Sequence, residues 1–267
     1  MTKTSKTDDE VVLAGGGRSL VTRRGDVVFR QGAPWSKTVL ALLRHLEECG
    51  FAEAPRVIGT GFDAAGREML SFIEGASIHP GPWDDAALPV IGDTLRRLHD
   101  AAASFTIPED AVWRPWFGRT IGQPSVIGHC DTGAWNIMAE DRRPVGLIDW
   151  EVAGPVDPLV ELAQAAWLNA LLFDDDIAER QGLGSPEARA RQVSMLLDGY
   201  GLAKAKRQGF VGLMIDFVVL NAANEAIECA VSPDMPAADA IAAITWRTRS
   251  AGWLVRHRAA LEQVIER

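Results

Sequence analysis

The sequence predicts an α+β protein with a small antiparallel-sheet N-terminal lobe and a larger helical C-terminal lobe. Up to about residue 74, short apolar runs alternate with glycine-containing turns, which is typical of antiparallel strands. From residue 75 onward, apolar residues recur at the three- and four-residue spacing of amphipathic helices. We therefore expect an N-terminal lobe over 1–74, with 1–10 as a disordered tail, and a C-terminal lobe over 75–267.

The composition is that of a globular protein from a reducing compartment. Charged residues make up 24% of the 267 residues, and the net charge of -9 argues against nucleic acid as a partner. The three cysteines form no CxxC pair, which argues against a disulfide framework or a zinc site. The N-terminus lacks an apolar signal core, and no apolar run reaches the roughly 18 residues of a membrane span. We expect a cytoplasmic protein without a membrane partner.

In the N-terminal lobe, turn chemistry separates short apolar strands from one helix. The helix is expected over 34–49, because its leucines and Val39 share one face and Gly50 ends it. The strands are expected over 11–13, 20–22, 27–30, 56–61 and 67–73.

The C-terminal lobe is expected to be mostly helical around one irregular stretch. Residues 104–124 are rich in proline and glycine and predict a loop. Helices are expected over 83–103, 156–172, 185–200, 203–230 and 234–263.

One part of the chain gathers the side chains that phosphoryl transfer requires. Asp131 is followed five residues later by Asn136, and Asp149 ends an apolar run downstream. Phosphoryl transfer uses a carboxylate to accept the proton of the attacking hydroxyl, and oxygen ligands to hold magnesium. Asp131 is therefore the candidate catalytic residue, and Asn136 with Asp149 the candidate metal ligands.

A predicted hairpin would bring the two metal-ligand candidates together. Strands over 137–140 and 145–149 flank a four-residue turn. If Glu140 faces Val145, Asn136 lies opposite Asp149, with Cβ atoms about 4.5–5.5 Å apart. A slip of one residue would separate them.

Each of these residues also has an ordinary structural explanation. A loop aspartate such as Asp131 more often shapes a turn than acts as a base. Asn136 could close the loop, and Asp149 could cap a helix. We expect His129 to brace the loop as a hydrogen-bond donor rather than to act in catalysis. The combined spacing is far more specific than any single member.

This pattern resembles the aminoglycoside phosphotransferase family, whose fold is like that of protein kinases. The resemblance covers about residues 11–170. His129-x-Asp131-x4-Asn136 looks like the catalytic loop, and residues 147–151 look like the metal-binding segment. The other stretches that resemble the family are Val152 to Pro158, Glu161-Leu162-Ala163, Leu95 to His99 and Ser71 to Gly75.

The resemblance implies a bilobal kinase-like fold and transfer of the γ-phosphoryl group of ATP or GTP, with Mg2+, to a small-molecule hydroxyl. Asp131 would orient and deprotonate that hydroxyl, and Asn136 with Asp149 would bind Mg2+. The implied cofactor-binding residues are Gly15, Gly16 and Gly17 over the phosphates, Arg30 at the α- and β-phosphates, and Phe72, Ile73 and Glu74 at the nucleobase.

The N-terminal lobe departs from the kinase pattern. Arg30 stands where kinases carry a lysine, and a guanidinium is wider than an ammonium but suits phosphate oxygens. The helix over 34–49 has no glutamate in its middle, since Glu47 and Glu48 lie at its far end. We therefore expect the kinase lysine–glutamate pair to be absent or replaced. No Asp-Phe-Gly or Ala-Pro-Glu is present, which disfavours a protein-substrate kinase.

The acceptor pocket is expected between the catalytic loop and the C-terminal helices. An acidic wall there could bind a polycation, although helix glutamates more often form a solvated face. Tryptophans could instead stack on a flat acceptor, although most are expected in the core. Aminoglycoside, macrolide, choline-like and sugar hydroxyls all stay open. The candidate acceptor-binding acids are Glu151, Asp157, Glu161, Glu225 and Glu228.

Two competing functions remain open beside the small-molecule kinase. Arg30 and the missing helix glutamate motivate a catalytically weak or inactive kinase-like module for nucleotide binding or immunity. A metal-dependent hydrolase that uses His129, Asp131 and Asp149 is the weakest, because no histidine pair has metal-ligand spacing.

Overall fold

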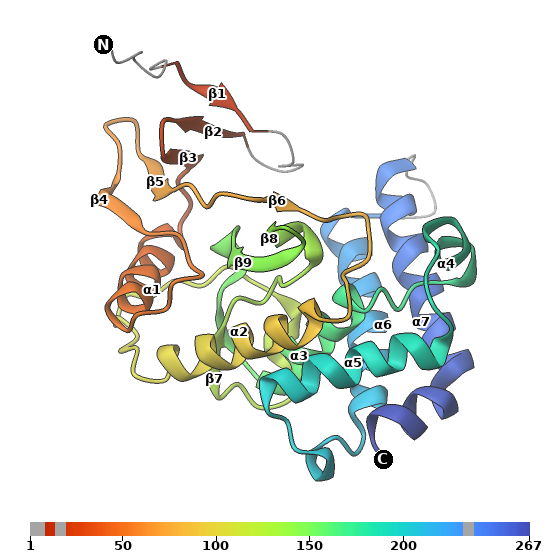
Figure 1. The fold of residues 1–267 in the computed structure, drawn as a ribbon. Coiled ribbons are helices and arrows are strands. Elements are labelled where there is room, and N and C mark those ends of the chain that lie inside the picture. Colours follow the sequence, from red (N-terminus) through yellow and green to blue (C-terminus); the bar gives the residue numbers. More distant parts are fainter. Residues whose placement is uncertain (1–8, 14–19, 232–237) are drawn as a thin grey trace, which may run out of the picture.

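The computed structural model describes residues 9–13, 20–231 and 238–267 and has the predicted two-lobed α+β fold (Figure 1). The N-terminal lobe is an antiparallel sheet with strand order β1-β2-β3-β5-β4 in the described residues. Its strands are β1 (Val11–Val12), β2 (Val21–Arg24), β3 (Val27–Gln31), β4 (Val57–Phe62) and β5 (Arg67–Ser71). Glu10 bonds to Arg67 and Thr22, so it belongs with the sheet and not with the predicted tail.

Helix α1 (Ser36–Glu48) joins the sheet to the rest of the molecule. Its apolar stripe is buried, with Leu42, Leu43 and Leu46 fully inaccessible to solvent. Gly50 follows the end of the helix, and its φ of 77° suits a residue without a side chain. Because α1 packs on both β4 and α2, it anchors the sheet to the C-terminal lobe.

The chain leaves the sheet through a short crossing segment that passes over the catalytic region. Gly75 has φ 116°, and a Cβ atom there would lie 2.7 Å from the carbonyl oxygen of Ala139. Only glycine fits this approach without strain. Strand β6 (Ala76–Ser77) then pairs with β8 (Ile137–Glu140), which pairs with β9 (Arg143–Leu147). The crossing segment is therefore tied to the hairpin behind the catalytic loop.

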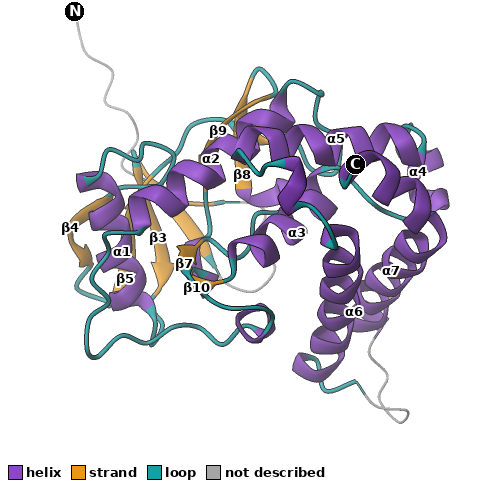
Figure 2. Ribbon diagram, turned by 90° about the horizontal axis from the view of Figure 1, so that it is seen from below, coloured by secondary structure: helices purple, strands orange, loops and turns teal. Residues whose placement is uncertain are grey.

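The C-terminal lobe is a set of packed helices, with α6 and α7 lying side by side at the end away from the sheet (Figure 2). Helices α3 and α5 begin with a capping side chain followed by proline, Asp157-Pro158 and Ser185-Pro186 respectively. The helices are α2 (Ala87–Ala102), α3 (Pro158–Asn169), α4 (Asp175–Gln181), α5 (Pro186–Tyr200), α6 (Phe210–Glu228) and α7 (Ala238–Ile265).

The structure differs from the predicted elements at several places. The segment expected as one helix over 203–230 is a 3-10 turn, η4 (Lys204–Lys206), followed by α6. Helix α4 was not predicted. The short strands β7 (Val126–Gly128) and β10 (Gly154–Val156) were also missed, and they pair with each other.

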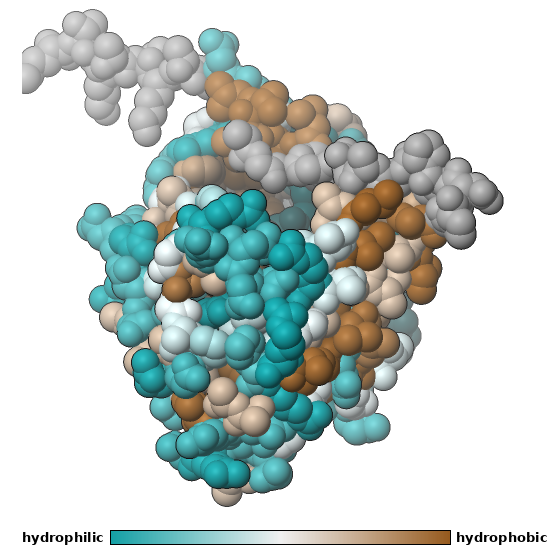
Figure 3. All heavy atoms as spheres, turned by 90° about the vertical axis from the view of Figure 1, so that its right-hand side faces the viewer, coloured by the Kyte–Doolittle hydropathy of each residue, from teal (hydrophilic) through white to brown (hydrophobic). Residues whose placement is uncertain are grey.

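Helix α6 is strongly apolar along its length. Among the described residues it is the one helix whose 19 residues and mean hydropathy of 1.5 meet the length and composition of a membrane span. It packs on α3 and α7 and buries Phe217 and Val218, and 39% of its apolar window is buried inside the fold. Figure 3 shows hydrophobic side chains along one side of an otherwise hydrophilic face. Large apolar side chains exposed on α6 and α7 include Val219, Leu220, Ile227, Ile241 and Val255.

Candidate active site

The predicted catalytic loop is held between two paired strands. Strand β7 leads into the loop, and β10 follows the segment that carries Asp149. The two strands pair in antiparallel register from Gly154 opposite Gly128 to Val156 opposite Val126. A Cβ atom at Gly128 would collide with the Glu161 carboxylate, so the loop needs glycine at its start. The entrance and exit of the candidate site are therefore fixed to each other.

Asp131 and Asn136 are in direct contact. The Asn136 amide nitrogen donates to a carboxylate oxygen of Asp131 at 2.9 Å and to its main-chain oxygen at 3.0 Å. A 3-10 turn, η2 (Ala134–Asn136), curls the loop back so that these residues meet. The Asn136 side chain is nearly buried, whereas Asp131 is partly exposed. The structure thus brings together the candidate base and one candidate metal ligand.

The hairpin forms, but the predicted register is wrong. Strand β9 begins two residues earlier than expected, because Asp141 and Arg142 alone make the turn, with φ of 47° and 61°. Glu140 lies opposite Arg143, and a bulge shifts the register near Met138. The main-chain oxygen of Asn136 accepts a hydrogen bond from the Ile148 amide at 2.9 Å.

Asp149 therefore lies one residue beyond the position opposite Asn136. It adopts a left-handed conformation, with φ 62° and ψ 65°, which turns the chain sharply at the end of the hairpin. Its side chain is 43% exposed and accepts a hydrogen bond from Arg30 at 2.6 Å. Asp149 thus bonds to a side chain of the N-terminal lobe.

His129 links the catalytic loop to the segment that carries Asp149. Its Nε2 donates to the main-chain oxygen of Ile148 at 2.9 Å, and its Nδ1 accepts from the Asp131 amide at 3.3 Å. These partners require the neutral imidazole with the proton on Nε2. Complete burial lowers the pKa of His129 from its ordinary value. His129 stands behind the loop, packed against the Trp150 ring.

Glu161 is buried and bonded on both carboxylate oxygens. One oxygen accepts from the Cys130 amide at 2.7 Å, and the other contacts His99 Nε2. Burial opposes ionisation, but these hydrogen bonds outweigh it and hold the pKa of Glu161 below its ordinary value. With 0% exposure, Glu161 braces the loop from beneath and does not line an acceptor pocket, contrary to the sequence-based expectation.

Arg30 is held between the two lobes by carboxylates. On the sheet side, its Nε and Nη2 bond to the Glu68 carboxylate at 3.0 Å and 2.9 Å. Across the cleft, its Nη1 meets Asp149 at 2.6 Å and Glu151 at 3.7 Å. Glu68 comes from β5, so a strand supplies the glutamate partner that helix α1 lacks.

The expected nucleobase segment lies where the chain leaves the sheet. The Arg23 guanidinium lies over the Phe72 ring, with its central carbon 3.4 Å from the ring centroid. The same arginine donates a hydrogen bond to Glu74 at 3.1 Å. Ile73 packs close to Gly146 on β9, where a Cβ atom would collide with it. The triplet Gly15, Gly16 and Gly17 lies outside the described residues.

The remaining acidic candidates do not form one wall. Asp157 caps α3 by accepting from the Leu159 amide at 2.9 Å. Glu151 bonds to Arg114, from the irregular stretch before the catalytic loop. On α6, Glu225 pairs with Arg247 at 3.2 Å, and Glu228 accepts from Asn224 at 3.0 Å.

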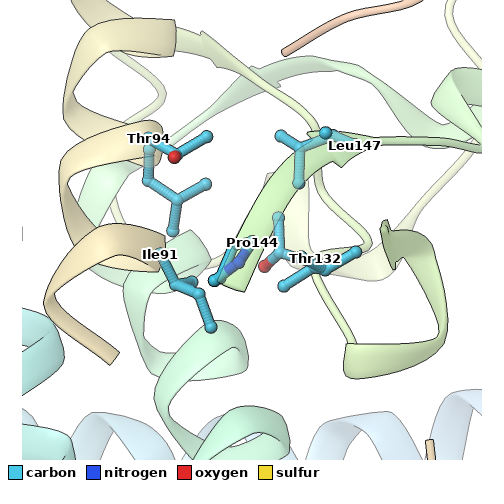
Figure 4. Close-up of a pocket in the computed structure, with 8 residues that line it drawn as sticks. Ile91, Thr94, Thr132, Pro144 and Leu147 are labelled. Atoms are coloured by element: carbon cyan, nitrogen blue, oxygen red, sulfur yellow. The ribbon is translucent and has the colours of Figure 1, made fainter. Parts of the chain in front are cut away.

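A small cavity of about 10 Å³ lies behind the catalytic loop (Figure 4). Figure 4 shows Ile91 and Thr94 of α2 facing Pro144 and Leu147 of β9, with Thr132 of the loop beside them. The Thr132 hydroxyl is buried there without a hydrogen-bond partner among the described residues. The cavity has room for about one water molecule, so it is packing space behind the loop and not a ligand pocket.

Sequence reasoning missed two residues of the Arg30 environment, Glu68 and Arg114. Glu68 lies 38 positions from Arg30, and only the pairing of β3 with β5 places them opposite each other. A charged residue inside a predicted strand was the available signal. Arg114 gave no such signal in the sequence, because it lies in a loop.

Comparison with known proteins shows the family of the chain. The model of the phosphotransferase enzyme family, APH, matches residues 109–208, which include Asp131, Asn136 and Asp149. Over 259 residues the chain is 61% identical to a trifolitoxin immunity protein of Rhizobium leguminosarum bv. trifolii, covering 97% of this chain and 99% of that protein. The chain belongs to the aminoglycoside phosphotransferase family.

Solved structures of small-molecule kinases share the fold. Amicoumacin kinase hAmiN, in complex with AMP-PNP, Ca2+ and Ami, has a TM-score of 0.68 at 12% identity, covering 92% of this chain and 89% of that one. A choline/ethanolamine kinase family protein of Mesorhizobium loti has a TM-score of 0.60 at 19% identity, covering 97% of this chain and 94% of that one. The gentamicin complex of APH(2")-IIa has a TM-score of 0.56 at 14% identity, covering 96% of this chain and 91% of that one.

Proposed function

We propose that the protein transfers the γ-phosphoryl group of ATP or GTP to a hydroxyl group of a small molecule, with Mg2+ as cofactor. The observation that carries the proposal is the contact of Asp131 with Asn136 in a loop braced from behind by His129 and Glu161. A carboxylate fixed in this way is prepared to receive a proton from a hydroxyl that approaches from the cleft.

The donor chemistry of the site fits magnesium. Asn136 uses its amide nitrogen on Asp131, which turns its amide oxygen away from that carboxylate. Asp149 offers an accessible carboxylate. Magnesium is commonly held by one or two carboxylates together with water and nucleotide phosphates. We assign Asn136 and Asp149 to the metal, which when bound would offset the negative charge of the phosphates.

Asp131 acts on the acceptor. It orients the hydroxyl and takes up its proton as the hydroxyl oxygen bonds to the γ-phosphorus. The bond from that phosphorus to the β–γ bridging oxygen breaks, and a nucleoside diphosphate and a phosphate monoester are left. His129 and Glu161 hold the loop still during this exchange.

The N-terminal lobe holds the nucleotide in this proposal, with its boundary at residue 74. Arg30 would meet the α- and β-phosphates, and the segment from Phe72 to Glu74 would face the nucleobase. The glycine triplet over 15–17 would cover the phosphates with backbone amides. The free cysteines fit a protein of the cytoplasm, where nucleotide is available.

Electrostatics do not single out a polycationic acceptor. Glu151 and Glu225 are each paired with arginine, and Asp157 is committed to a helix cap. We therefore propose a hydroxyl compound without a requirement for multiple positive charges. Because a relative is a trifolitoxin immunity protein, we further propose a role in immunity to such a toxin.

Replacing the candidate base tests the enzyme. Asp131→Asn keeps the shape of the side chain but removes the proton acceptor, so kcat for phosphate transfer should fall by about 10²–10⁴-fold. Transfer from ATP and from GTP is measured over a panel of aminoglycoside, macrolide, choline-like and sugar acceptors. Asp141→Asn, at the exposed tip of the hairpin, is the matched control and should keep wild-type activity. Unchanged activity in Asp131→Asn would refute the proposal.

The same variant separates the enzyme from an immunity module without turnover. If immunity depends on phosphate transfer, toxin-sensitive cells that express Asp131→Asn should be as sensitive as cells without the protein. If they stay protected at equal protein levels, the inactive kinase-like module is the correct alternative. Mass spectrometry of the toxin after incubation with protein and nucleotide shows directly whether a phosphate has been added.

A further inference from the structure

We propose that Glu68 is the positioning residue for Arg30, replacing with a strand carboxylate the helix glutamate that protein kinases use. This inference rests on the proposed phosphotransferase function, in which Arg30 meets the nucleotide phosphates. It assigns a role to a buried acid for which the family motifs in the sequence gave no signal.

The sheet register sets the pair. Arg30 on β3 lies directly opposite Glu68 on β5 in the antiparallel ladder, so their side chains leave the same face of the sheet. One Glu68 oxygen receives both Nε and Nη2 of Arg30, at 3.0 Å and 2.9 Å. Glu68 is 2% exposed, so these charge-assisted bonds form away from solvent. The pair fixes the plane of the guanidinium.

The other oxygen of Glu68 is held by helix α1. It accepts a hydrogen bond from the Ser36 hydroxyl, whose oxygen in turn accepts from the Ala33 amide at 2.7 Å. Ser36 is the first residue of α1, and the acids of α1, Glu47 and Glu48, lie at its opposite end. Helix α1 thus contributes a hydroxyl that orients the carboxylate instead of contributing the carboxylate itself.

The geometry leaves one edge of Arg30 for the cleft. With Nε and Nη2 taken up by Glu68, Nη1 points toward Asp149 at 2.6 Å and Glu151 at 3.7 Å. Without Glu68, the guanidinium would be free to turn fully onto Asp149 and Glu151. Nη1 already bonds to Asp149 in this structure, and without Glu68 the other guanidinium nitrogens would be drawn there too, away from the phosphates. Glu68 therefore acts through Arg30 and does not itself touch the nucleotide.

Nucleotide affinity is the direct test. Glu68→Gln should raise the dissociation constant for Mg-ATP or Mg-GTP, measured by calorimetry, at least about tenfold, as expected for loss of a charge-assisted contact. Glu48→Gln is the control, because Glu48 lies at the end of α1 opposite Ser36. This variant should bind nucleotide as the wild type does. Ser36→Ala removes only the hydroxyl that orients Glu68 and should give a smaller rise. Denaturant unfolding of each variant confirms that the protein is folded.

A spectroscopic signal reports on Arg30 itself. The Nε–H resonance of Arg30, assigned by its absence in Arg30→Lys, should exchange slowly with water in the wild type and rapidly in Glu68→Gln. In Glu48→Gln the Arg30 Nε–H should exchange as slowly as in the wild type. Equal exchange in wild type and Glu68→Gln would overturn the inference without any nucleotide present.

A double-mutant cycle decides whether Glu68 acts through Arg30. If it does, Arg30→Gln combined with Glu68→Gln should bind nucleotide no more weakly than Arg30→Gln alone. Additive losses, or wild-type affinity in Glu68→Gln, would overturn the inference and leave the proposed function intact. Wild-type protein that neither binds nucleotide nor transfers phosphate would overturn the proposed function and this inference together.

Discussion

At the scale of single residues, His129 shows how one buried side chain can organise a loop. One imidazole nitrogen donates to the Ile148 carbonyl oxygen and the other accepts from the Asp131 amide. A protonated ring would place a second N–H against that amide. These two hydrogen bonds therefore require a neutral His129, and burial lowers the pKa of its imidazole accordingly.

This pKa makes stability depend on pH. The unfolded histidine takes up a proton near its ordinary value of 6.5, whereas the buried ring resists protonation. Between the two pKa values the unfolded state binds more protons, so the free energy of unfolding falls as pH decreases below 6.5. Urea unfolding between about pH 7 and pH 5 should show a smaller decline in His129→Gln. Identical declines in both proteins would contradict this assignment.

The residues of the site differ in how well the sequence could indicate them. Asp131 and Asn136 are close in sequence and carry a specific spacing, and the structure brings them into contact. Glu68 is far from Arg30 in sequence, and its charge inside a predicted strand was a signal that did not name Arg30 as its partner. Its place became visible only when the register of β3 and β5 was known.

At the scale of elements, the crossing segment between the lobes depends on a glycine. Gly75→Ala would force a left-handed conformation and a collision with the Ala139 carbonyl oxygen. We expect it to lower the free energy of unfolding by about 1–3 kcal/mol, as strained residues do. Gly66→Ala is the control, because Gly66 has φ 78° but open space at the Cβ position. Chemical denaturation of both variants should show the larger loss for Gly75→Ala.

Two elements show why sequence patterns were insufficient. The hairpin was predicted, but its register depended on a two-residue turn in which both residues have positive φ without any glycine. The bulge near Met138 has no sequence signature either. Helix α4 was missed because it buries no side chain and has no apolar period. Asp174 as N-cap and Gly182 at the end were its available signals.

At the scale of the whole molecule, the two lobes share one hydrophobic core. The buried cluster runs from Val39 and Leu46 of α1 through α2 to the helices of the C-terminal lobe. The change from strand patterns to helical patterns predicted two lobes correctly. The sequence pattern could not show that the two lobes share a core, because contacts between distant segments leave no periodic pattern.

The shared core predicts cooperative unfolding of both lobes. Leu46→Ala should destabilise the protein by about 2–5 kcal/mol, because Leu46 is fully buried. Circular dichroism and tryptophan fluorescence should then report one transition that moves together to lower denaturant. Val255→Ala, at a side chain that is 57% exposed, should change stability by less than about 0.5 kcal/mol. Separate transitions of the two probes would show that the lobes unfold independently.

The serine at the start of α1 has a consequence for control of the molecule. Protein kinases are switched off when their helix moves and withdraws its glutamate from the lysine. Here the carboxylate belongs to β5, within the hydrogen-bonded sheet, and a movement of α1 would remove only the Ser36 hydroxyl from it. Such an arrangement has no off position of that kind. It suits a protein that is active at all times, as the proposed role in immunity would require.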